Sequence, residues 1–303
     1  MQRSLEIPGE HAPLSPAPAR RTSGRVTEPA PAIFDRAARR RRRDRAAPTY
    51  REHDFLRAAM LEGMAERLSA VTRAFTDVLD LGCFDASFPA PPGARVARFD
   101  PGFAWARAGG GVQGDEDRLP FADASFDLVV SAGVLDQVDD LPGALTLIRR
   151  VLRPDGLFLG AFVGGGSLPA LRAALRAGDG ERPAARLHPQ IEVRAAGDLL
   201  ARAGFALPVA DVEWLTVRYR DLGRLLDDLR GMAAGNILTS RTPLTRGALV
   251  GAAQAFAQSA DADGRTTERF ALVFLTGWAP DPSQPRPARR GSARASLAAA
   301  LKP

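Results

Sequence analysis

The sequence predicts an α/β fold in which a mostly parallel sheet carries helices on both faces. Short apolar runs of strand length alternate with segments that repeat apolar residues at helical spacing, as expected when crossover helices join buried parallel strands. Apolar residues make up 45% of the chain and charged residues 25%, so 303 residues can bury a full core. Glycine or acidic residues directly follow two of the apolar runs, where doubly wound sheets bind ligands.

Four apolar runs are the expected buried strands. They lie at residues 78–81, 96–99, 127–132 and 157–162. Between the last two, Leu141, Leu145, Ile148 and Leu152 recur at helical spacing, with a proline in the first turn and a Pro-Asp-Gly stop behind them. This pattern predicts a strand, crossover helix, strand unit.

The second half of the chain predicts a less regular arrangement. We expect a helix at 198–203, a strand at 209–219, helices at 221–233 and 245–258, and a final strand at 269–277. A helical insertion before the last strand suggests a lid over a substrate site.

The charge divides unevenly along the chain. Residues 1–32 and 280–303 are rich in Pro, Ala, Ser and Arg without hydrophobic periodicity, so we expect two disordered basic tails around one folded domain at 33–279. The net charge of +6 splits into +6 for residues 1–50, +5 for 282–303 and −5 between them. An acidic body does not favour nucleic acid. No apolar run reaches the ~20 residues of a membrane span.

Cysteine and histidine usage argues against a metal or disulfide framework. Cys83 is the single cysteine, and His11, His53 and His188 lie far apart in sequence, so we expect no metal site. The first thirty residues match neither a secretory signal nor a clean transit peptide. We therefore expect a cytoplasmic protein.

The run Val-Leu-Asp-Leu-Gly-Cys at 78–83 resembles motif I of the class I S-adenosylmethionine (SAM) dependent methyltransferases. The resemblance implies that Asp80 and Gly82 bind the amino acid end of SAM. It also implies a Rossmann-like, mostly parallel seven-stranded sheet with helices on both faces.

Further landmarks of that family follow in order. Asp100 follows the second strand, where the family places the acid that binds the ribose hydroxyls. Asp115 stands before a Leu-Pro-Phe turn, where an acid contacts the adenine, and the adjacent Glu116 is assigned to the same site. Asp127 leads the fourth strand, and we expect it to cap or hydrogen-bond locally rather than bind a ligand.

A closer resemblance covers residues 33–279. It rests on Ile-Phe-Asp-Arg at 33–36 with the arginines that follow, Asp-Leu-Pro-Gly-Ala-Leu at 140–145, Gly-Gly-Gly-Ser-Leu at 164–168, Asp-Leu-Arg-Gly-Met at 228–232 and Thr-Gly-Trp at 276–278. These segments look like the methyltransferase-fold assembly factors of respiratory complex I, described in eukaryotes as arginine hydroxylases. They are similar also to the malonyl-carrier-protein methyltransferases of biotin synthesis.

The resemblance implies two functions. One is SAM-dependent methylation of a protein or carrier-linked acceptor, which needs little beyond proximity and therefore no catalytic residue that we can assign. The other is a non-methylating assembly factor with a complex I subunit as its protein partner, tied to arginine hydroxylation, for which the sequence holds no iron or flavin motif. Asp228, Arg230 and Asn236 are candidates for the acceptor pocket, or else belong to a helix-face ion pair.

The chain departs from the methyltransferase pattern in the glycine loop. Phe84 and Ala86 stand where the family has its second and third glycines. Pro89, Pro91 and Pro92 then exclude a helix interior, because proline lacks the amide donor. We expect the first crossover helix to be missing and SAM binding to be weakened.

Three further expectations concern this region. Phe84 or Phe88 should turn inward and take up space that SAM would fill, and the helical stretch at 50–68 should cover the face left bare. The arginines at 39–43 should pair with the acidic body or dock an acidic partner. Asp136 and Gln137 replace the His-Trp pair that the family carries after strand four.

Overall fold

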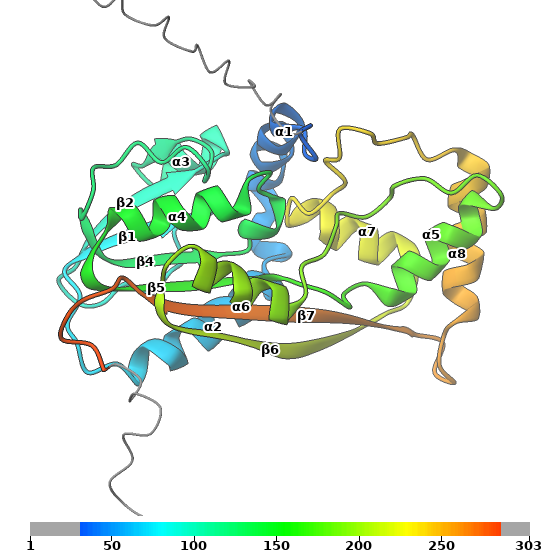
Figure 1. Cartoon of the computed structure of the whole chain (residues 1–303). Helices are drawn as coiled ribbons and strands as arrows, with labels where there is room; N and C mark the ends of the chain where they lie inside the picture. The colour runs from blue at the N-terminus through cyan, green and yellow to red at the C-terminus, as the bar shows by residue number, and fades with distance from the viewer. Residues whose placement is uncertain (1–30, 286–303) are drawn as a thin grey trace, which may run out of the picture. The chain divides into compact units, whose positions relative to one another are not determined.

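The computed structural model describes residues 31–285, and the sheet within it is the predicted one. Its strands are β1 (Asp77–Leu81), β2 (Arg95–Asp100), β3 (Val112–Gln113), β4 (Phe126–Ala132), β5 (Leu152–Val163), β6 (Ala206–Tyr219) and β7 (Thr266–Trp278). The seven strands lie in the order β3-β2-β1-β4-β5-β7-β6 (Figure 1). Strands β1 to β5 pair in parallel, and β7 runs antiparallel to β5 and β6. The tails predicted at 1–32 and 280–303 lie almost wholly outside the described residues.

Helices cover both faces of the sheet, as predicted. They are α1 (Arg36–Ala46), the 3-10 helix η1 (Ala47–Glu52), α2 (Phe55–Ser69), α3 (Phe103–Ala108), η2 (Leu135–Gln137), α4 (Leu141–Val151), α5 (Pro169–Asp179), α6 (Val193–Arg202), α7 (Leu222–Gly231) and α8 (Arg246–Gln258). Figure 1 shows α4 and α6 on one face, α2 on the other, and α5 with α8 side by side beyond the sheet. Among residues 31–285, no helix is long and apolar enough to cross a membrane.

Two apolar cores follow from this layering. In one, Leu145 and Ile148 of α4 pack with Leu79 and Val129, which project from β1 and β4. In the other, Met60 of α2 belongs to the core formed by the alternate side chains of the same strands. A parallel strand buried on both faces must be apolar at every position, which is why these strands are continuous runs in the sequence.

The first crossover helix is absent, as the prolines predicted. Between β1 and β2 the chain runs from Gly82 to Ala94 without a helix. Helix α2 covers the face of the sheet that the missing helix would otherwise cover. Its residues Leu56, Met60 and Met64 belong to the same core as Phe88. The expected position of the helical stretch at 50–68 is therefore confirmed.

The insertion before the last strand is helical, and it contacts the N-terminal helix. Helices α7 and α8 lie between β6 and β7 in the chain. Phe34 forms an isolated β-bridge with Leu238 in the loop after α7, and both side chains share a small core with Ala38 and Ile237. This contact fixes α1 across the carboxyl ends of the strands.

Candidate functional site

The carboxylates predicted to bind a cofactor gather at the carboxyl edge of the sheet. Asp80 lies near the end of β1, Asp100 ends β2, and Asp115 with Glu116 follows β3. Their exposed fractions are 2%, 0%, 7% and 0%. Charged groups buried this deeply need partners, because an unpaired buried charge is very costly.

One face of α1 supplies the partners for three of these acids. Arg36, Arg39, Arg40 and Arg43 follow the spacing i, i+3, i+4, i+7, which places them on one side of a helix. Arg39 and Arg43 are themselves buried, while Arg41 on another face is exposed. The arginine run is therefore salt-bridged to the acidic body, one of the two expectations for it.

Arg43 and Asp100 form a forked, buried ion pair. Arg43 Nε donates to Asp100 Oδ1 at 2.9 Å and Nη2 donates to Oδ2 at 2.5 Å. The backbone amides of Phe84 and Gly102 donate to the same carboxylate at 3.0 and 2.7 Å. Both oxygens of Asp100 are thus engaged by groups of this chain.

The neighbouring acids are engaged in the same way. Arg39 binds both oxygens of Glu116, at 2.6 and 2.8 Å. Arg40 donates to Asp115 Oδ2 at 2.7 Å, and Arg36 approaches the same oxygen at 3.1 Å. Forked guanidinium-carboxylate pairs are among the stronger hydrogen-bonded contacts in proteins, so α1 is held firmly here.

Asp80 differs from the other acids because its partner is more distant. Arg57 Nη2 of α2 lies 3.8 Å from Asp80 Oδ1, and this guanidinium also donates to Ser87 Oγ and to the carbonyl of Cys83. Burial raises the pKa of Asp80 to about 6. The surrounding residues therefore stabilise the ionised form of Asp80 only in part.

The loop after β1 keeps the backbone shape of a glycine-rich loop without all its glycines. Gly82, Phe84 and Ala86 have φ angles of +78°, +46° and +59°, the region that favours glycine. A Cβ at Gly82 would lie 2.5 Å from a methyl group of Val134, so this position also lacks room for a side chain. At Phe84 and Ala86 the chain bears the cost of a left-handed residue with a side chain.

The Phe84 ring fills the space beside this loop. Only 3% of the residue is exposed; its ring stacks on Tyr50 with centroids 4.9 Å apart, and Arg43 Cζ lies 3.8 Å from its centroid. Phe88 is also buried, so the inward turn predicted for Phe84 or Phe88 is found for both rings. The residues present do not fit SAM in the place that the resemblance implies, because Asp100, the acid expected to bind the ribose, is bound by Arg43, and the Phe84 ring packs beside the loop expected to bind the amino acid end.

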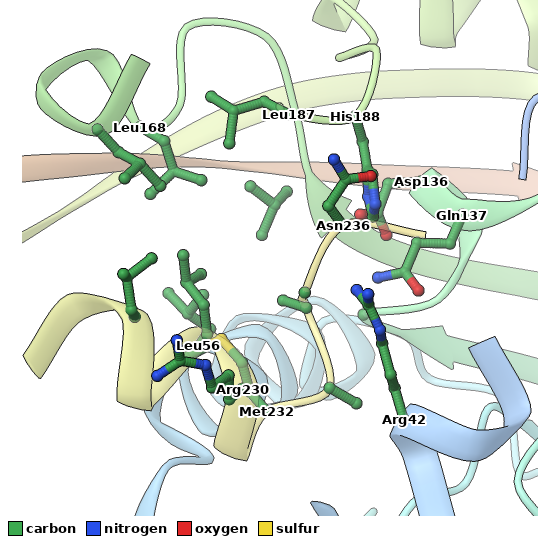
Figure 2. A pocket seen from close by; sticks show the side chains of 18 of the residues that line it. Arg42, Leu56, Asp136, Gln137, Leu168, Leu187, His188, Arg230, Met232 and Asn236 are labelled. Atoms are coloured by element: carbon green, nitrogen blue, oxygen red, sulfur yellow. The ribbon is translucent and has the colours of Figure 1, made fainter. Parts of the chain in front are cut away.

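A large cavity lies beside the carboxylate cluster, between α1, α2, α5 and α7. Its volume is about 710 Å³, within the range of ligand pockets. Of the predicted acceptor residues, Arg230 and Asn236 line it, as Figure 2 shows. Asp228 does not line the cavity. Its Oδ1 lies 2.8 Å from His53 Nδ1, within hydrogen-bond distance. Arg230 also pairs with Asp227 three residues earlier, the alternative expected for this helix.

Sequence reasoning missed most of the polar residues of this cavity. Arg42, Asp136, Gln137, His188 and Asn236 gather at one end of it (Figure 2). We call this set the polar end. These residues come from four separate segments, so no local motif could have grouped them.

Asp136 and His188, two of the titratable groups of the polar end, have pKa values shifted by burial. Burial raises the pKa of Asp136 to about 6. Burial, followed by the charges of Arg42 and Arg39, lowers the pKa of His188 to about 4. His188 Nε2 accepts the amide proton of Ile237 at 3.0 Å, which requires the neutral ring at pH 7.

The remaining chemistry of the site is restricted. Among residues 31–285, no cluster of three or more His, Cys, Asp or Glu side chains could hold a metal ion. Cys83 is buried, and burial raises the pKa of its thiol to about 12, so it is not a nucleophile at pH 7. The described residues therefore form a binding cavity in which Asp136 is the acid poised nearest to neutral pH.

Comparisons with known proteins agree with the fold. A family described as a methyltransferase domain matches residues 79–160. The arginine-hydroxylase NDUFAF5, mitochondrial, of Danio rerio is 34% identical over 284 residues, covering 88% of each chain. Its human counterpart is 33% identical over 285 residues, covering 88% of this chain and 82% of the relative.

A second group of relatives carries a methyltransferase name. The malonyl-[acyl-carrier protein] O-methyltransferase of Methylovorus sp. is 33% identical over 273 residues, covering 82% of this chain and 90% of the relative. Among solved structures, the YcgJ protein of Bacillus subtilis superposes with a TM-score of 0.52 at 15% identity, covering 74% of this chain and 99% of that one. At this identity the structural match supports the fold alone.

Proposed function

Because this chain belongs to the methyltransferase-domain family that includes NDUFAF5 and the malonyl-[acyl-carrier protein] O-methyltransferases, we propose that it keeps the family's fold but acts as a binding protein without a methyl donor. The observation that carries the proposal is the Arg43–Asp100 pair. In this pair Arg43 occupies the hydrogen-bond acceptors of Asp100, the carboxylate expected to hold the ribose of SAM.

The energetics favour a closed site over an exchangeable one. To admit a ribose at Asp100, SAM would have to displace a guanidinium whose own exposed fraction is 4% or less. Arg43 would then lose its buried counter-charge, and breaking a buried pair in this way costs about 3–5 kcal/mol. Withdrawing α1 as a whole would break the pairs of Arg39 and Arg40 as well.

The partner we propose is a protein, and the resemblance to complex I assembly factors makes a subunit of that complex the first candidate. The chain offers no motif for arginine hydroxylation, so the proposed role is binding rather than oxidation. We propose a cytoplasmic location in a bacterium.

A second candidate function is SAM-dependent methylation of a carrier-linked acceptor. The relative of Methylovorus sp. and the survival of Asp80, Gly82 and Asp100 at their expected places favour it. It requires that α1 leave the carboxylates before the methyl donor enters.

Titration of the full chain with SAM and S-adenosylhomocysteine distinguishes the two functions. A ligand at 100 times its dissociation constant stabilises a protein by about 2.7 kcal/mol, which a thermal-shift assay detects readily. We expect no shift at millimolar concentrations of either compound. A saturable shift that calorimetry confirms would refute the binding-protein proposal and support methylation.

Two variants test the cause of the closure. The double substitution Arg43→Gln with Phe84→Gly frees Asp100 and empties the ring space, so it should bind S-adenosylhomocysteine more tightly than the wild type. Arg41→Gln is the matched control, because it removes the same charge from an exposed position of α1. A gain of binding in the control would show that net charge, not the ion pair, excludes the ligand.

A further inference from the structure

The large cavity has two chemically distinct ends. Figure 2 shows the polar end on one side and Leu56, Leu168 and Leu187 toward the other, where Arg230 also lies beside Leu56 and is paired with Asp227. Leu171 of α5 and Phe270 of β7 add to the apolar end, and each is 1% exposed. The apolar end is deep enough to be part of the second core, so a chain entering it would leave water almost completely.

The polar end carries a cation that the protein does not neutralise. Within residues 31–285, Arg42 has neither a hydrogen bond nor an ion pair from its side chain, although it is half-buried. Burial, followed by the charges of Arg241 and Arg45, lowers the pKa of Arg42. The charge of Asp35 opposes this shift, but its carboxylate forms its ion pair with Arg241, so Arg42, like Arg45, faces the cavity without an ion-pair partner in the described part of the chain, in contrast to Arg39, Arg40 and Arg43.

The charges of the lining balance overall, because Asp54 and Asp136 also lack an ion-pair partner among residues 31–285, but two arginines at or beside the polar end are left unpaired. Six arginines line the cavity against two acids, Asp54 and Asp136. Arg57, Arg186, Arg230 and Arg241 each have a carboxylate partner. Arg42 and Arg45 have no such partner among the described residues, and they lie at the polar end or beside it.

Neutral donors complete the polar end. His188 accepts through Nε2, so its neutral ring carries the remaining proton on Nδ1 as a donor. Gln137, 8% exposed, adds an amide. Asp136 also lies at the polar end and burial raises its pKa to about 6, so Arg42 and these neutral donors suit a carboxylate or phosphate best where Asp136 is protonated.

We propose that this cavity binds a single-chain amphiphile, with its carboxylate or phosphate headgroup held by Arg42 and its alkyl chain lying along Leu56, Leu168 and Leu171. The proposal goes beyond the protein-binding function above, because it assigns a small-molecule ligand class to the cavity, and it does not depend on that function.

Calorimetric titration of the full chain with single-chain compounds below their micelle concentrations tests this site. Hexanoate, octanoate and decanoate should bind with stoichiometry one, and affinity should rise about fourfold per methylene until the apolar end is full. 1-Octanol and octyltrimethylammonium, which share the chain but lack the anion, should bind at least tenfold more weakly than octanoate. Acetate and inorganic phosphate should show no saturable binding, and octyl phosphate compared with octanoate identifies the preferred headgroup.

Two variants separate the headgroup contact from the chain contact. Arg42→Gln should weaken octanoate at least tenfold and leave 1-octanol unchanged, whereas Leu187→Trp, which fills the apolar end from a half-buried loop position, should weaken both. Arg41→Gln, exposed on the same helix and outside the cavity lining, should leave octanoate binding unchanged.

Equal affinity for octanoate, 1-octanol and octyltrimethylammonium, absence of saturable octanoate binding, or an Arg42→Gln variant indistinguishable from Arg41→Gln would each overturn the proposal. Titration of SAM in the same preparation keeps the two proposals apart. Binding of SAM refutes the loss of the methyl donor, while the octanoate series alone decides the amphiphile site.

Discussion

The Arg43–Asp100 pair should behave as a unit in a double-mutant cycle. Arg43→Gln removes two charge-assisted hydrogen bonds and leaves a carboxylate that is 0% exposed without a counter-charge. Breaking a buried pair from one side costs about 3–5 kcal/mol. In a domain of this size, this corresponds to a fall in Tm of about 6–20 °C.

The double variant should recover part of this loss. Asp100→Asn keeps an oxygen that can accept from Phe84 or Gly102 but removes the charge that Arg43 neutralises. With both charges gone, the cost should be at least about 2 kcal/mol smaller than the sum of the single changes, since contacting residues show coupling of this size. Urea unfolding followed by circular dichroism measures the three free energies.

Arg41→Gln serves as the baseline, and we expect a change within about 0.5 kcal/mol because the residue is exposed. A loss of less than about 1 kcal/mol in Arg43→Gln, or strict additivity in the double variant, would refute the view that α1 closes the carboxylate site through this pair.

Three further predictions follow from single positions. Because burial raises the pKa of Asp136 to about 6, above the 3.8 of the exposed group, the folded state binds its proton more tightly and the free energy of unfolding falls as the pH rises between these values. Asp136→Asn should therefore stabilise the protein by about 1–3 kcal/mol at pH 7.5 and lose this advantage by pH 4. Urea titrations at both pH values measure the two free energies of unfolding. Equal effects of the substitution at both pH values would contradict the raised pKa of Asp136. Gly82→Ala should destabilise by more than about 2 kcal/mol, because φ is +78° and its Cβ would meet Val134, and a thermal melt matching the wild type would exclude both constraints. Phe256→Ala, at a side chain with 0% exposure that anchors α8, should cost about 3–5 kcal/mol in chemical denaturation, whereas Val250→Ala at 56% exposure on the same helix should change stability by less than about 0.5 kcal/mol.

The sequence predicted most of the fold because its strongest signals are local. Strand β1 is apolar except for Asp77 and Asp80, since both faces of a parallel sheet are covered, and α4 was predicted from apolar residues at helical spacing, of which Leu141, Leu145 and Ile148 lie in the helix. Helix α5 went unpredicted and α3, with six residues, was too short to carry a periodic pattern. The absent crossover helix was predictable, because each proline lacks the amide proton that a helix interior requires.

The candidate site was predictable only in part. The acids Asp80, Asp100 and Asp115 were assigned from the resemblance to class I methyltransferases, and the structure gathers them at the carboxyl edge of the parallel strands. The sequence analysis expected the arginines at 39–43 to pair with the acidic body or dock a partner, but it did not predict that Arg36, Arg39, Arg40 and Arg43 share one face of α1. Which acids they would meet depended on how α1 crosses the sheet.

The sequence by itself thus determined the strands of the sheet, the order of the carboxylates along the chain and the replacement of two glycines in the loop after β1. The tertiary structure alone decided that Arg43 reaches Asp100 while Arg42, one residue earlier, enters a cavity without a counter-charge. The physical reason is that local pattern fixes which face of a helix a residue occupies, whereas its partner is set by the packing of segments distant in the chain. Here the contact of Phe34 with Leu238, 204 positions apart, holds α1 in the orientation that closes one site and lines the other.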